Sequence, residues 1–307
     1  MNQNQTDFDV IILGAGPAGL AAGIYASRKG LKTLILEAEM PGGRAATAPL
    51  IENYPALDQP LTGLELTQKM QAQLERLGGK ITNEKAISLQ LDKSTKTVRT
   101  RKGQHTTKTI IIAIGVNRKK LMIPGEEKFL GTGVSYCAVC DGPLLRDRKV
   151  AVIGSGEEAI EDATYLTDLA SEVFLVSNEP KFSTPNDSLK RLIEKENITI
   201  LEGYQAQSIE GEQLAKTLRL KHIADEKEKH LAVEGIFIAI GVVPMTEIIK
   251  KTGVNIDKRG CIIVDRKQAT NLPGVFAAGD CTCGGMQIVT AVGEGAMAAI
   301  SASRTIT

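Results

Sequence analysis

The chain of 307 residues is 42% hydrophobic and 24% charged, an ordinary composition for a globular protein, and its length favours two domains over one. Lys and Arg together number 37, and Asp and Glu together number 36. This balance gives no support to a nucleic-acid-binding surface or a membrane-binding surface.

The N-terminal stretch MNQNQTDFD has neither the basic region nor the apolar segment of a signal peptide. The longest apolar run, around residues 110–114, is too short to span a bilayer. Five cysteines and no visible export signal predict a cytoplasmic protein. In those reducing surroundings, a Cys-x-x-Cys pair is more often catalytic or metal-binding than structural.

The first predicted unit is a strand, a glycine-rich turn, a helix and a second strand that ends in an acid. Gly14, Gly16 and Gly19 form the pattern GxGxxG. Gly14 allows a tight turn, Gly16 lets the backbone approach a pyrophosphate, and Gly19 lets the helix pack closely on the strand. The helix N-terminus offers free N–H groups to a phosphate, and Glu37 can accept hydrogen bonds from ribose hydroxyls. The complete unit predicts a dinucleotide site rather than a chance glycine-rich turn.

Two cysteines, Cys137 and Cys140, follow further along the chain, and Asp141 comes directly after them. A zinc site needs about four ligands, and no nearby histidine completes such a set. A purely structural disulfide is unusual in a reducing compartment. We therefore predict a redox pair, with Asp141 as its general acid–base. The alternative for Asp141 is a turn-forming residue ahead of Gly142 and Pro143.

A second strand–turn–helix unit begins directly after the cysteine pair. Gly154, Gly156 and Ala159 form the pattern GxGxxA, so the chain carries two Rossmann-like modules, the second inserted in the first. Here Glu157 and Glu158 follow the turn directly. Carboxylates at a helix N-terminus suit the helix dipole but repel a pyrophosphate. At a separation of ~5 Å, each pair of like charges costs about 1 kcal/mol in water and about 3 kcal/mol at an effective dielectric of ~20.

No compensating arginine is expected near these glutamates, so their repulsion should weaken dinucleotide binding at the second turn. The alternative is that both side chains point to solvent and only cap the helix.

The C-terminal part repeats a strand end with an acid. An apolar strand runs into Gly279 and Asp280, and a helix of small residues follows. Together with the N-terminal unit, this predicts one FAD site built from both ends of the chain. A disulfide between Cys281 and Cys283, across one residue, would be strained, so these two are expected to be loop residues. Cys261 is expected to be a buried strand residue.

The order of GxGxxG, Cys-x-x-Cys-Asp, GxGxxA and GVFAAGD resembles the low-molecular-weight thioredoxin reductase family over almost the whole chain. The segments GGRAATAPLIENYP, GIFIAIGVVPMT and QIVTAVGEGAMAA support the resemblance. We therefore expect an α/β fold with two three-layer, Rossmann-like domains, each with a small β-meander. The FAD-binding domain would comprise residues 1–116 and 244–307. An NAD(P)H-binding-like domain that carries the cysteine pair would comprise residues 117–243.

The resemblance also implies a homodimeric flavoprotein that passes electrons from NADPH through FAD to the cysteine pair and then to thioredoxin. Cys140 would lie next to the flavin, and the Cys137 thiolate would attack the substrate disulfide. No metal is implied. The residues expected to bind FAD are Gly14, Gly16, Pro17, Ala18, Gly19, Glu37, Gly43, Arg44, Asn53, Gly115, Gly279, Asp280, Gln287 and Ile288.

The sequence departs from the family where the NADPH 2′-phosphate should bind. The family has a His-Arg-Arg run after the second strand of the central domain and a further Arg beyond it. Here the corresponding residues are Ser177, Asn178, Glu179 and Ser183. We therefore predict a donor other than NADPH, as in the pyridine-nucleotide-independent members, of which the ferredoxin-dependent flavin thioredoxin reductases are one type. The sequence does not decide the electron donor among ferredoxin, NADH, NADPH and a second flavin.

Three other functions compete with this interpretation. The first is an ordinary NAD(P)H-dependent thioredoxin reductase. The second is a small-molecule dithiol oxidase of the same fold, which passes electrons to oxygen. The third is a non-enzymatic flavin redox sensor, against which the complete Cys-x-x-Cys-Asp motif argues.

Overall fold

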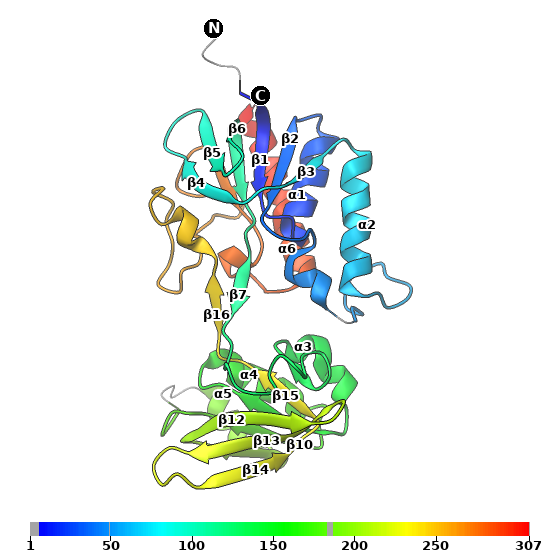
Figure 1. Ribbon diagram of the computed structural model, residues 1–307, viewed down its shortest axis with the longest axis vertical. Coiled ribbons are helices and arrows are strands. Elements are labelled where there is room, and N and C mark those ends of the chain that lie inside the picture. The colour runs from blue at the N-terminus through cyan, green and yellow to red at the C-terminus, as the bar shows by residue number, and fades with distance from the viewer. Residues whose placement is uncertain (1–5, 49, 183–186, 307) are drawn as a thin grey trace. The chain divides into compact units, whose positions relative to one another are not determined.

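The computed structural model describes residues 6–48, 50–182 and 187–306, and Ser183 lies outside this part of the chain. It divides into unit 1, Met1–Asn117 with Val243–Thr307, and unit 2, Arg118–Val242 (Figure 1). Asn117 and Val243 therefore fall in unit 1, whereas the expected central domain included both.

Unit 1 is built on a mainly parallel sheet in the order β3-β2-β1-β6-β5-β4, with β17 also paired to β6. The central strand, β1 (Phe8–Leu13), is buried from Val10 to Leu13, as a parallel strand covered on both faces should be. Strands β4 and β5 are antiparallel and form a meander with β6. The other strands are β2 (Thr33–Glu37), β3 (Lys80–Asn83), β4 (Ala86–Gln90), β5 (Lys96–Thr100), β6 (Gln104–Ile112) and β17 (Val275–Ala277).

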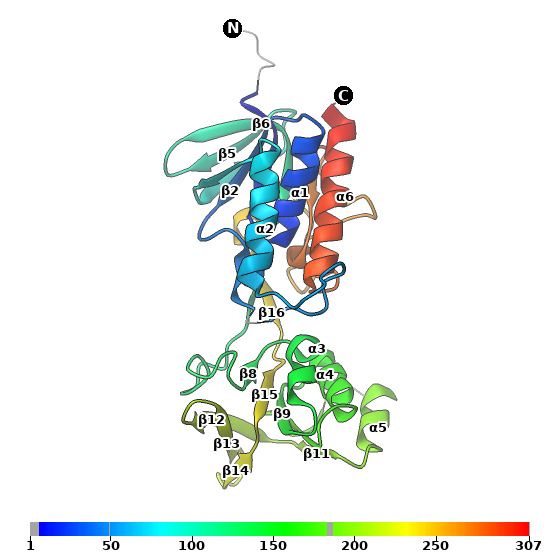
Figure 2. The ribbon, with the colours of Figure 1, turned by 90° about the vertical axis from the view of Figure 1, so that its right-hand side faces the viewer.

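Three helices lie side by side on one face of this sheet: α1 (Pro17–Arg28), α2 (Gly63–Arg76) and α6 (Ile288–Ile306) (Figure 2). Small residues let α1 and α6 approach closely. A Cβ atom added to Gly295 of α6 would lie 2.0 Å from the Ala18 carbonyl oxygen of α1. This close packing brings the middle of α6 against the first turn of α1, although the two helices are far apart in the sequence.

Unit 2 contains a fully parallel sheet in the order β11-β10-β9-β15-β8 and a separate antiparallel meander, β12-β13-β14. Both units thus confirm the expected α/β fold with Rossmann-like sheets. The strands are β8 (Val134–Ser135), β9 (Lys149–Ile153), β10 (Glu172–Val176), β11 (Ile198–Leu201), β12 (Tyr204–Gly211), β13 (Ala215–His222), β14 (Glu228–Ala232) and β15 (Gly235–Ile238). The helices are α3 (Ala138–Asp141), α4 (Glu157–Thr167) and α5 (Asp187–Ile193).

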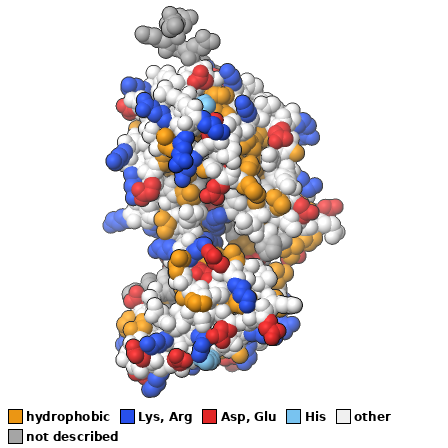
Figure 3. Space-filling model, viewed as in Figure 1, with side chains coloured by type: hydrophobic (Ala, Val, Ile, Leu, Met, Phe, Trp, Pro, Cys, Tyr) orange, Lys and Arg blue, Asp and Glu red, His pale blue; other side chains and the backbone are white. Residues whose placement is uncertain are grey.

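The strands next to the two boundaries, β7 (Val116–Arg118) and β16 (Val242–Pro244), pair as a two-stranded sheet. On the face drawn in Figure 3, acidic and basic side chains are interspersed over each unit. No helix in the described ranges is long and apolar enough to cross a membrane.

Candidate active site

The glycine-rich turn of unit 1 is crowded at two glycines and open at the third. Gly14 has φ +97°, and an added Cβ would lie 2.4 Å from the Ala113 carbonyl oxygen. At Gly19 the added Cβ would lie 1.8 Å from the Gly14 carbonyl oxygen. At Gly16 it would meet nothing within 4 Å. The backbone at Gly16, the residue before α1, is therefore open to a ligand, as a pyrophosphate site requires.

Glu37 lies at the end of β2 and holds the same turn. Its carboxylate accepts hydrogen bonds from the backbone N–H of Ala15 at 2.6 Å and of Glu39 at 2.8 Å. Each carboxylate oxygen has a second lone pair, so Glu37 can also accept a hydrogen bond from a ribose hydroxyl. The side chain that was expected to bind the ligand thus also positions the turn.

Residues from both ends of the chain meet beside this turn. Arg44 Nη1 lies 3.3 Å from Asp280 Oδ2, and Asn53 Nδ2 lies 3.3 Å from Gln287 Oε1. These contacts join the segment after β2 to the segment between β17 and α6. The structure therefore brings expected cofactor residues from the two ends together.

The other expected cofactor residues surround the same turn. An added Cβ at Gly43 would lie 3.3 Å from the Gly16 Cα atom, and one at Gly279 would lie 2.8 Å from the Ala18 Cβ atom. Pro17 and Ile288 are the first residues of α1 and α6, and Gly115 has a φ of +68°. An open glycine, a helix N-terminus, a buried acid and polar side chains from both chain ends fit an extended dinucleotide such as FAD.

Glu294 supports this site and was not among the sequence candidates. Its Oε2 atom accepts a hydrogen bond from the Gly279 N–H at 2.7 Å and from the Thr282 hydroxyl at 3.2 Å. Burial raises the pKa of Glu294. The sequence did offer one signal, an acid in a part of α6 that otherwise has small and apolar residues. The partners of Glu294 could not be predicted, because they lie outside α6 and meet it only in the folded protein.

The two cysteines of the Cys-x-x-Cys motif form a disulfide at the start of α3. The Cys137 and Cys140 Cα atoms are 5.3 Å apart, and Cys137 Sγ accepts a hydrogen bond from the Cys140 N–H at 3.2 Å. Cys137 is half-buried and Cys140 is exposed. Among the described residues, no group of three or more His, Cys, Asp or Glu side chains is placed to hold a metal ion.

Asp141, the last residue of α3, is held by Ser135. The Ser135 hydroxyl donates to Asp141 Oδ2 at 2.5 Å and accepts the Cys137 N–H at 3.0 Å. Ser135 is buried at the end of β8. A single hydroxyl thus links the acid to the backbone of the first cysteine, a positioning role that the sequence analysis did not assign to Ser135.

The residue before the cysteine pair, Tyr136, is held by a buried acid, Glu126. Its carboxylate accepts hydrogen bonds from the Tyr136 hydroxyl at 2.5 Å and from the backbone N–H groups of Leu121 and Met122 at 3.0 and 2.7 Å. Burial and the Glu126 carboxylate raise the pKa of Tyr136, so the phenol stays protonated. Glu126 therefore ties the backbone at residues 121–122 to the residue directly before Cys137.

The second glycine-rich turn is crowded at its first glycine and open at its second, as the first turn is, but Gly154 lacks the positive φ of Gly14. An added Cβ at Gly154 would lie 2.1 Å from the Ala239 carbonyl oxygen, whereas one at Gly156 would meet nothing within 4 Å. Glu157 and Glu158 begin α4 directly after it. A dinucleotide thus meets no steric barrier at Gly156, but the two glutamates bring negative charge that the start of α1 lacks.

One expectation about this charge is wrong. Arg118 Nη1 lies 3.0 Å from Glu158 Oε1, so an arginine does offset one of the two glutamates. Arg118 belongs to β7, far from α4 in the sequence, and pattern reasoning within the second module therefore missed it. Glu157 and Glu158 consequently do not act as two uncompensated charges.

The positions expected to bind a 2′-phosphate lie directly after β10. Ser177 is fully buried, and its hydroxyl accepts the Glu179 N–H at 3.0 Å, so it closes a turn. Asn178 and Glu179 are exposed. The fourth position, Ser183, lies outside the described residues.

Asp162 is a titratable group on α4 that the sequence analysis overlooked. Burial, with a contribution from Glu158, raises the pKa of Asp162 to about 7, while Arg118 opposes the shift. The helix after the second turn therefore carries an acid that is partly protonated near neutral pH.

Two of the remaining cysteines form a disulfide that the sequence analysis did not predict. Cys283 forms a disulfide with Cys261, not with Cys281, and the Cα atoms of the pair are 5.7 Å apart. Cys281 is a free thiol and fully buried. Cys261 is buried, as expected, but it lies beside an isolated β-bridge at Ile262 rather than in a strand. The Cys261 pairing was not predictable because the two residues are brought together only by the fold.

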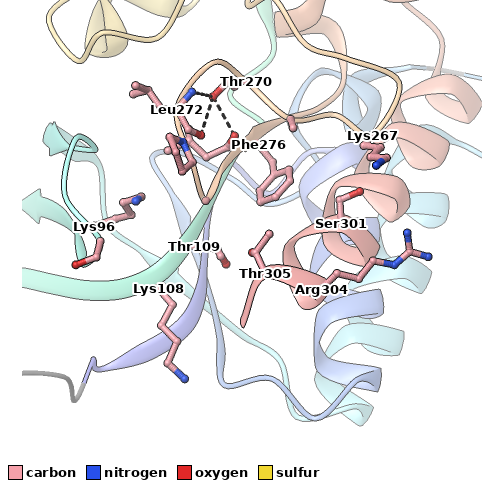
Figure 4. Close-up of a pocket in the computed structure, with 15 residues that line it drawn as sticks. Lys96, Lys108, Thr109, Lys267, Thr270, Leu272, Phe276, Ser301, Arg304 and Thr305 are labelled. Carbon is pink, nitrogen blue, oxygen red and sulfur yellow. Dashed lines mark hydrogen bonds between the residues drawn. The ribbon is translucent and has the colours of Figure 1, made fainter. Parts of the chain in front are cut away.

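A cavity of about 510 Å³ in unit 1 lies away from this site (Figure 4). Its lining includes Lys96, Thr270, Phe276 and Arg304, but none of the residues expected to bind FAD. The Thr270 hydroxyl there is 2.9 Å from the Val275 carbonyl oxygen and serves the local turn. This cavity therefore does not belong to the candidate active site.

Known proteins similar to the chain agree with this geometry. The family model for the pyridine nucleotide-disulphide oxidoreductases matches residues 8–295. The thioredoxin reductase of Mycolicibacterium smegmatis is 39% identical over 306 residues, 99% of this chain and 98% of that protein. The structure of the thioredoxin reductase from Giardia duodenalis has a TM-score of 0.93 at 32% identity, covering 98% of this chain and 99% of the other. A ferredoxin-flavin thioredoxin reductase from Clostridium acetobutylicum has a TM-score of 0.52 at 30% identity, covering 97% of each chain.

Proposed function

The chain belongs to the pyridine nucleotide-disulphide oxidoreductase family and is a flavin disulfide oxidoreductase of thioredoxin reductase type. From this premise we propose its electron donor, its substrate and the residues of its site. It reduces thioredoxin or a similar protein disulfide through Cys137 and Cys140. Its electrons come from a donor other than NADPH, such as ferredoxin. By the same family resemblance, we infer a homodimer, which light scattering of the purified protein tests. A cytoplasmic location stays a prediction.

FAD would be held in unit 1 by the open turn at Gly16, the N-terminus of α1, Glu37 and the Arg44–Asp280 pair. The Asn53–Gln287 contact would add polar groups to the same site. When bound, FAD supplies two-electron reduction of a disulfide and accepts electrons either as a hydride or one at a time. This second property is what makes a one-electron donor compatible with the fold.

The cysteine pair carries the electrons to the substrate. Reduction of the Cys137–Cys140 disulfide takes two electrons and two protons and yields two thiols. The Cys137 thiolate then attacks a substrate sulfur and displaces the other, and Cys140 resolves the mixed disulfide, which re-forms the Cys137–Cys140 bond. Asp141, held by the Ser135 hydroxyl, would take a proton from one thiol and return it to the leaving sulfur.

The charge at the second turn is the observation that carries the proposed donor. Where the family has three cationic positions after β10, this chain has Ser177, Asn178 and Glu179. Arg118 offsets Glu158, but Glu157, which is exposed, is a second acid in the first turn of α4. At ~5 Å from a phosphate, one such charge costs about 1–3 kcal/mol. Together with the lost 2′-phosphate contacts, this disfavours NADPH.

A ferredoxin donor is energetically sufficient. A plant-type ferredoxin near −400 mV can reduce a thioredoxin near −270 mV, a gap of about 130 mV, or about 6 kcal/mol for two electrons. The structure from Clostridium acetobutylicum, a ferredoxin-flavin thioredoxin reductase, is 30% identical, so a ferredoxin donor is compatible with this fold.

A turnover assay tests the proposed function. The holoenzyme is supplied in turn with NADPH, NADH and reduced ferredoxin under anaerobic conditions, and reduction of thioredoxin is followed by thiol titration. We expect turnover with ferredoxin, and none above background with NADPH. Turnover with a small dithiol and oxygen, with none on thioredoxin, would instead indicate the dithiol oxidase.

An ordinary NADPH-dependent enzyme is the second candidate, and two cations favour it. Arg118 lies at the second turn, and Lys181 is exposed shortly after β10. If NADPH binds there, substitution of Lys181 by Met should raise the KM for NADPH while the KM for thioredoxin stays the same. If neither KM changes, Lys181 gives no support to NADPH binding.

A further inference from the structure

The second disulfide ties two segments of unit 1 beside the FAD site. Cys261 and Cys283 are separated by 22 residues in the chain and joined in the structure. Cys283 ends the short helix Asp280–Thr282, which begins with the acid that pairs with Arg44. The disulfide therefore holds the segment that carries one of the expected FAD contacts.

One hydrogen bond connects the same two segments, and another holds Cys261 within its own segment. The Ile262 N–H donates to the Cys281 carbonyl oxygen at 2.9 Å, and the Cys261 N–H donates to Asp257 Oδ1 at 2.9 Å. Cys283 has a φ of +61°, a left-handed conformation that is uncommon for a residue with a side chain, and its N–H donates to the Asp280 carbonyl oxygen. The covalent bond stabilises this conformation.

We propose that Cys261–Cys283 is a second thiol-exchange site, distinct from Cys137–Cys140, whose reduction by a dithiol weakens the hold of Asp280 on FAD. This inference rests on the FAD site of the proposed function but not on the proposed donor.

The exchange has one accessible sulfur. Cys283 is half-buried, whereas Cys261 is 2% exposed, so a dithiol thiolate reaches Cys283 first and displaces Cys261. Cys261 takes up a proton, and the second thiol of the reductant resolves the mixed disulfide. Cys261 and Cys283 gain two electrons and two protons, and the dithiol is oxidised to its cyclic disulfide.

The nearby third cysteine does not compete in this exchange. Cys281 is fully buried, and its thiol lies 3.5 Å from the Ile112 carbonyl oxygen and 3.4 Å from that of Ala278. Burial raises the pKa of Cys281 to about 12, so the reactive thiolate is not populated at neutral pH. Cys281 thus provides an internal control, an unreactive thiol two positions from the reactive one.

The test uses a variant in which the first disulfide cannot respond, with Cys137→Ser and Cys140→Ser combined. Only Cys261–Cys283 can then be reduced, and neither of its cysteines is altered. The apoprotein is equilibrated with dithiothreitol or its oxidised form, and FAD affinity is measured by flavin fluorescence. We expect affinity to fall about tenfold on reduction, within the usual range for coupled sites.

Coupling is reciprocal, so FAD should also make this disulfide harder to reduce. A tenfold effect corresponds to about 30 mV for a two-electron couple. Differential alkylation and mass spectrometry report the redox state of each cysteine in the same samples. In the Cys137→Ser, Cys140→Ser background, a further Cys283→Ser substitution should weaken FAD binding and remove its response to dithiothreitol. A further Cys281→Ala substitution in the same background should leave the response intact.

Equal FAD affinity in both redox states, or immediate alkylation of Cys261 and Cys283 in the untreated protein, overturns the inference. A chain that binds no FAD in either state would refute the FAD site itself. A donor assay that favours NADPH refutes only the proposed donor, so the failures are distinguishable.

Discussion

At the scale of single residues, the two glycine-rich turns pose a matched comparison. Gly16 and Gly156 each precede a helix, and an added Cβ at either meets nothing within 4 Å. Their φ angles of −71° and −90° suit any residue. An alanine at either position should therefore leave the fold intact and report on the ligand alone.

The first prediction is that Gly16→Ala weakens FAD binding by at least about tenfold, because the methyl group occupies the space that a pyrophosphate needs. Gly156→Ala should leave FAD binding and ferredoxin-driven turnover unchanged. Flavin fluorescence and steady-state kinetics measure both. Loss of turnover in the Gly156 variant would show that the second turn binds the working donor.

Gly19→Ala provides the contrast. Its Cβ would lie 1.8 Å from the Gly14 carbonyl oxygen, so this variant should lose stability as well as FAD. A fold as stable as the parent in thermal unfolding would mean that the turn is looser than the structure shows.

The second prediction concerns Asp141. Asp141→Asn keeps the hydrogen bond from Ser135 but cannot move a proton, so thioredoxin turnover should fall about a hundredfold with FAD affinity unchanged. Ser135→Ala should have a smaller effect and shift the pH profile. Asp147→Asn, at an exposed acid in the same segment, is the control. Equal turnover in the Asp141 and Asp147 variants would mean that Asp141 is not the general acid–base and only forms the turn.

At the scale of elements, α4 carries a pH-sensitive contribution to stability. The pKa of Asp162 is raised from 3.8 to about 7 by burial and by Glu158. Between these values the native state holds a proton that the unfolded state releases. The stabilising contribution is therefore complete below about pH 4 and is lost as pH rises towards 7.

The third prediction follows from this linkage. Asp162→Asn should raise the free energy of unfolding at pH 8 by roughly 1–2 kcal/mol, less than the full shift implies because solvent partly screens the group. At pH 4 the variant and the parent should have similar stability. Urea unfolding at both pH values measures this, and an equal effect at both would point to a packing change instead.

The elements themselves were predictable where their signals are local. The turn at Gly14–Gly19, the strand that ends at Glu37 and the alternating strands of the meanders depend on residues close in sequence. Arg118, Glu294 and Cys261 were not predictable as functional partners. Each meets its partner only after strands and helices far apart in the chain have packed together. The incorrect expectation about the glutamates and the unpredicted Cys261–Cys283 disulfide have this same cause.

At the scale of the whole molecule, the account depends on one difference between two similar modules. Both have an open glycine at a helix N-terminus, but the second has acids after its turn and lacks the family's cations after β10. The fold of unit 2 is therefore compatible with a dinucleotide, while its charges oppose one. Restored cations should then restore binding.

The fourth prediction is that Asn178→Arg combined with Glu179→Arg raises affinity for NADPH at least about tenfold, because each Arg replaces an uncharged or repulsive side chain beside the expected 2′-phosphate. Both positions are exposed, so folding should not suffer. Calorimetric titration with NADPH and NADH measures the gain, and NADH should gain less. Equal gains for the two nucleotides would place the 2′-phosphate elsewhere.

The most direct measurement is anaerobic rapid mixing of the unaltered, oxidised holoenzyme with each donor while the flavin absorbance is followed. The account predicts rapid bleaching by reduced ferredoxin and no bleaching by micromolar NADPH on the timescale of turnover. Bleaching by NADPH at about 10 per second, an ordinary enzymatic rate, would contradict it.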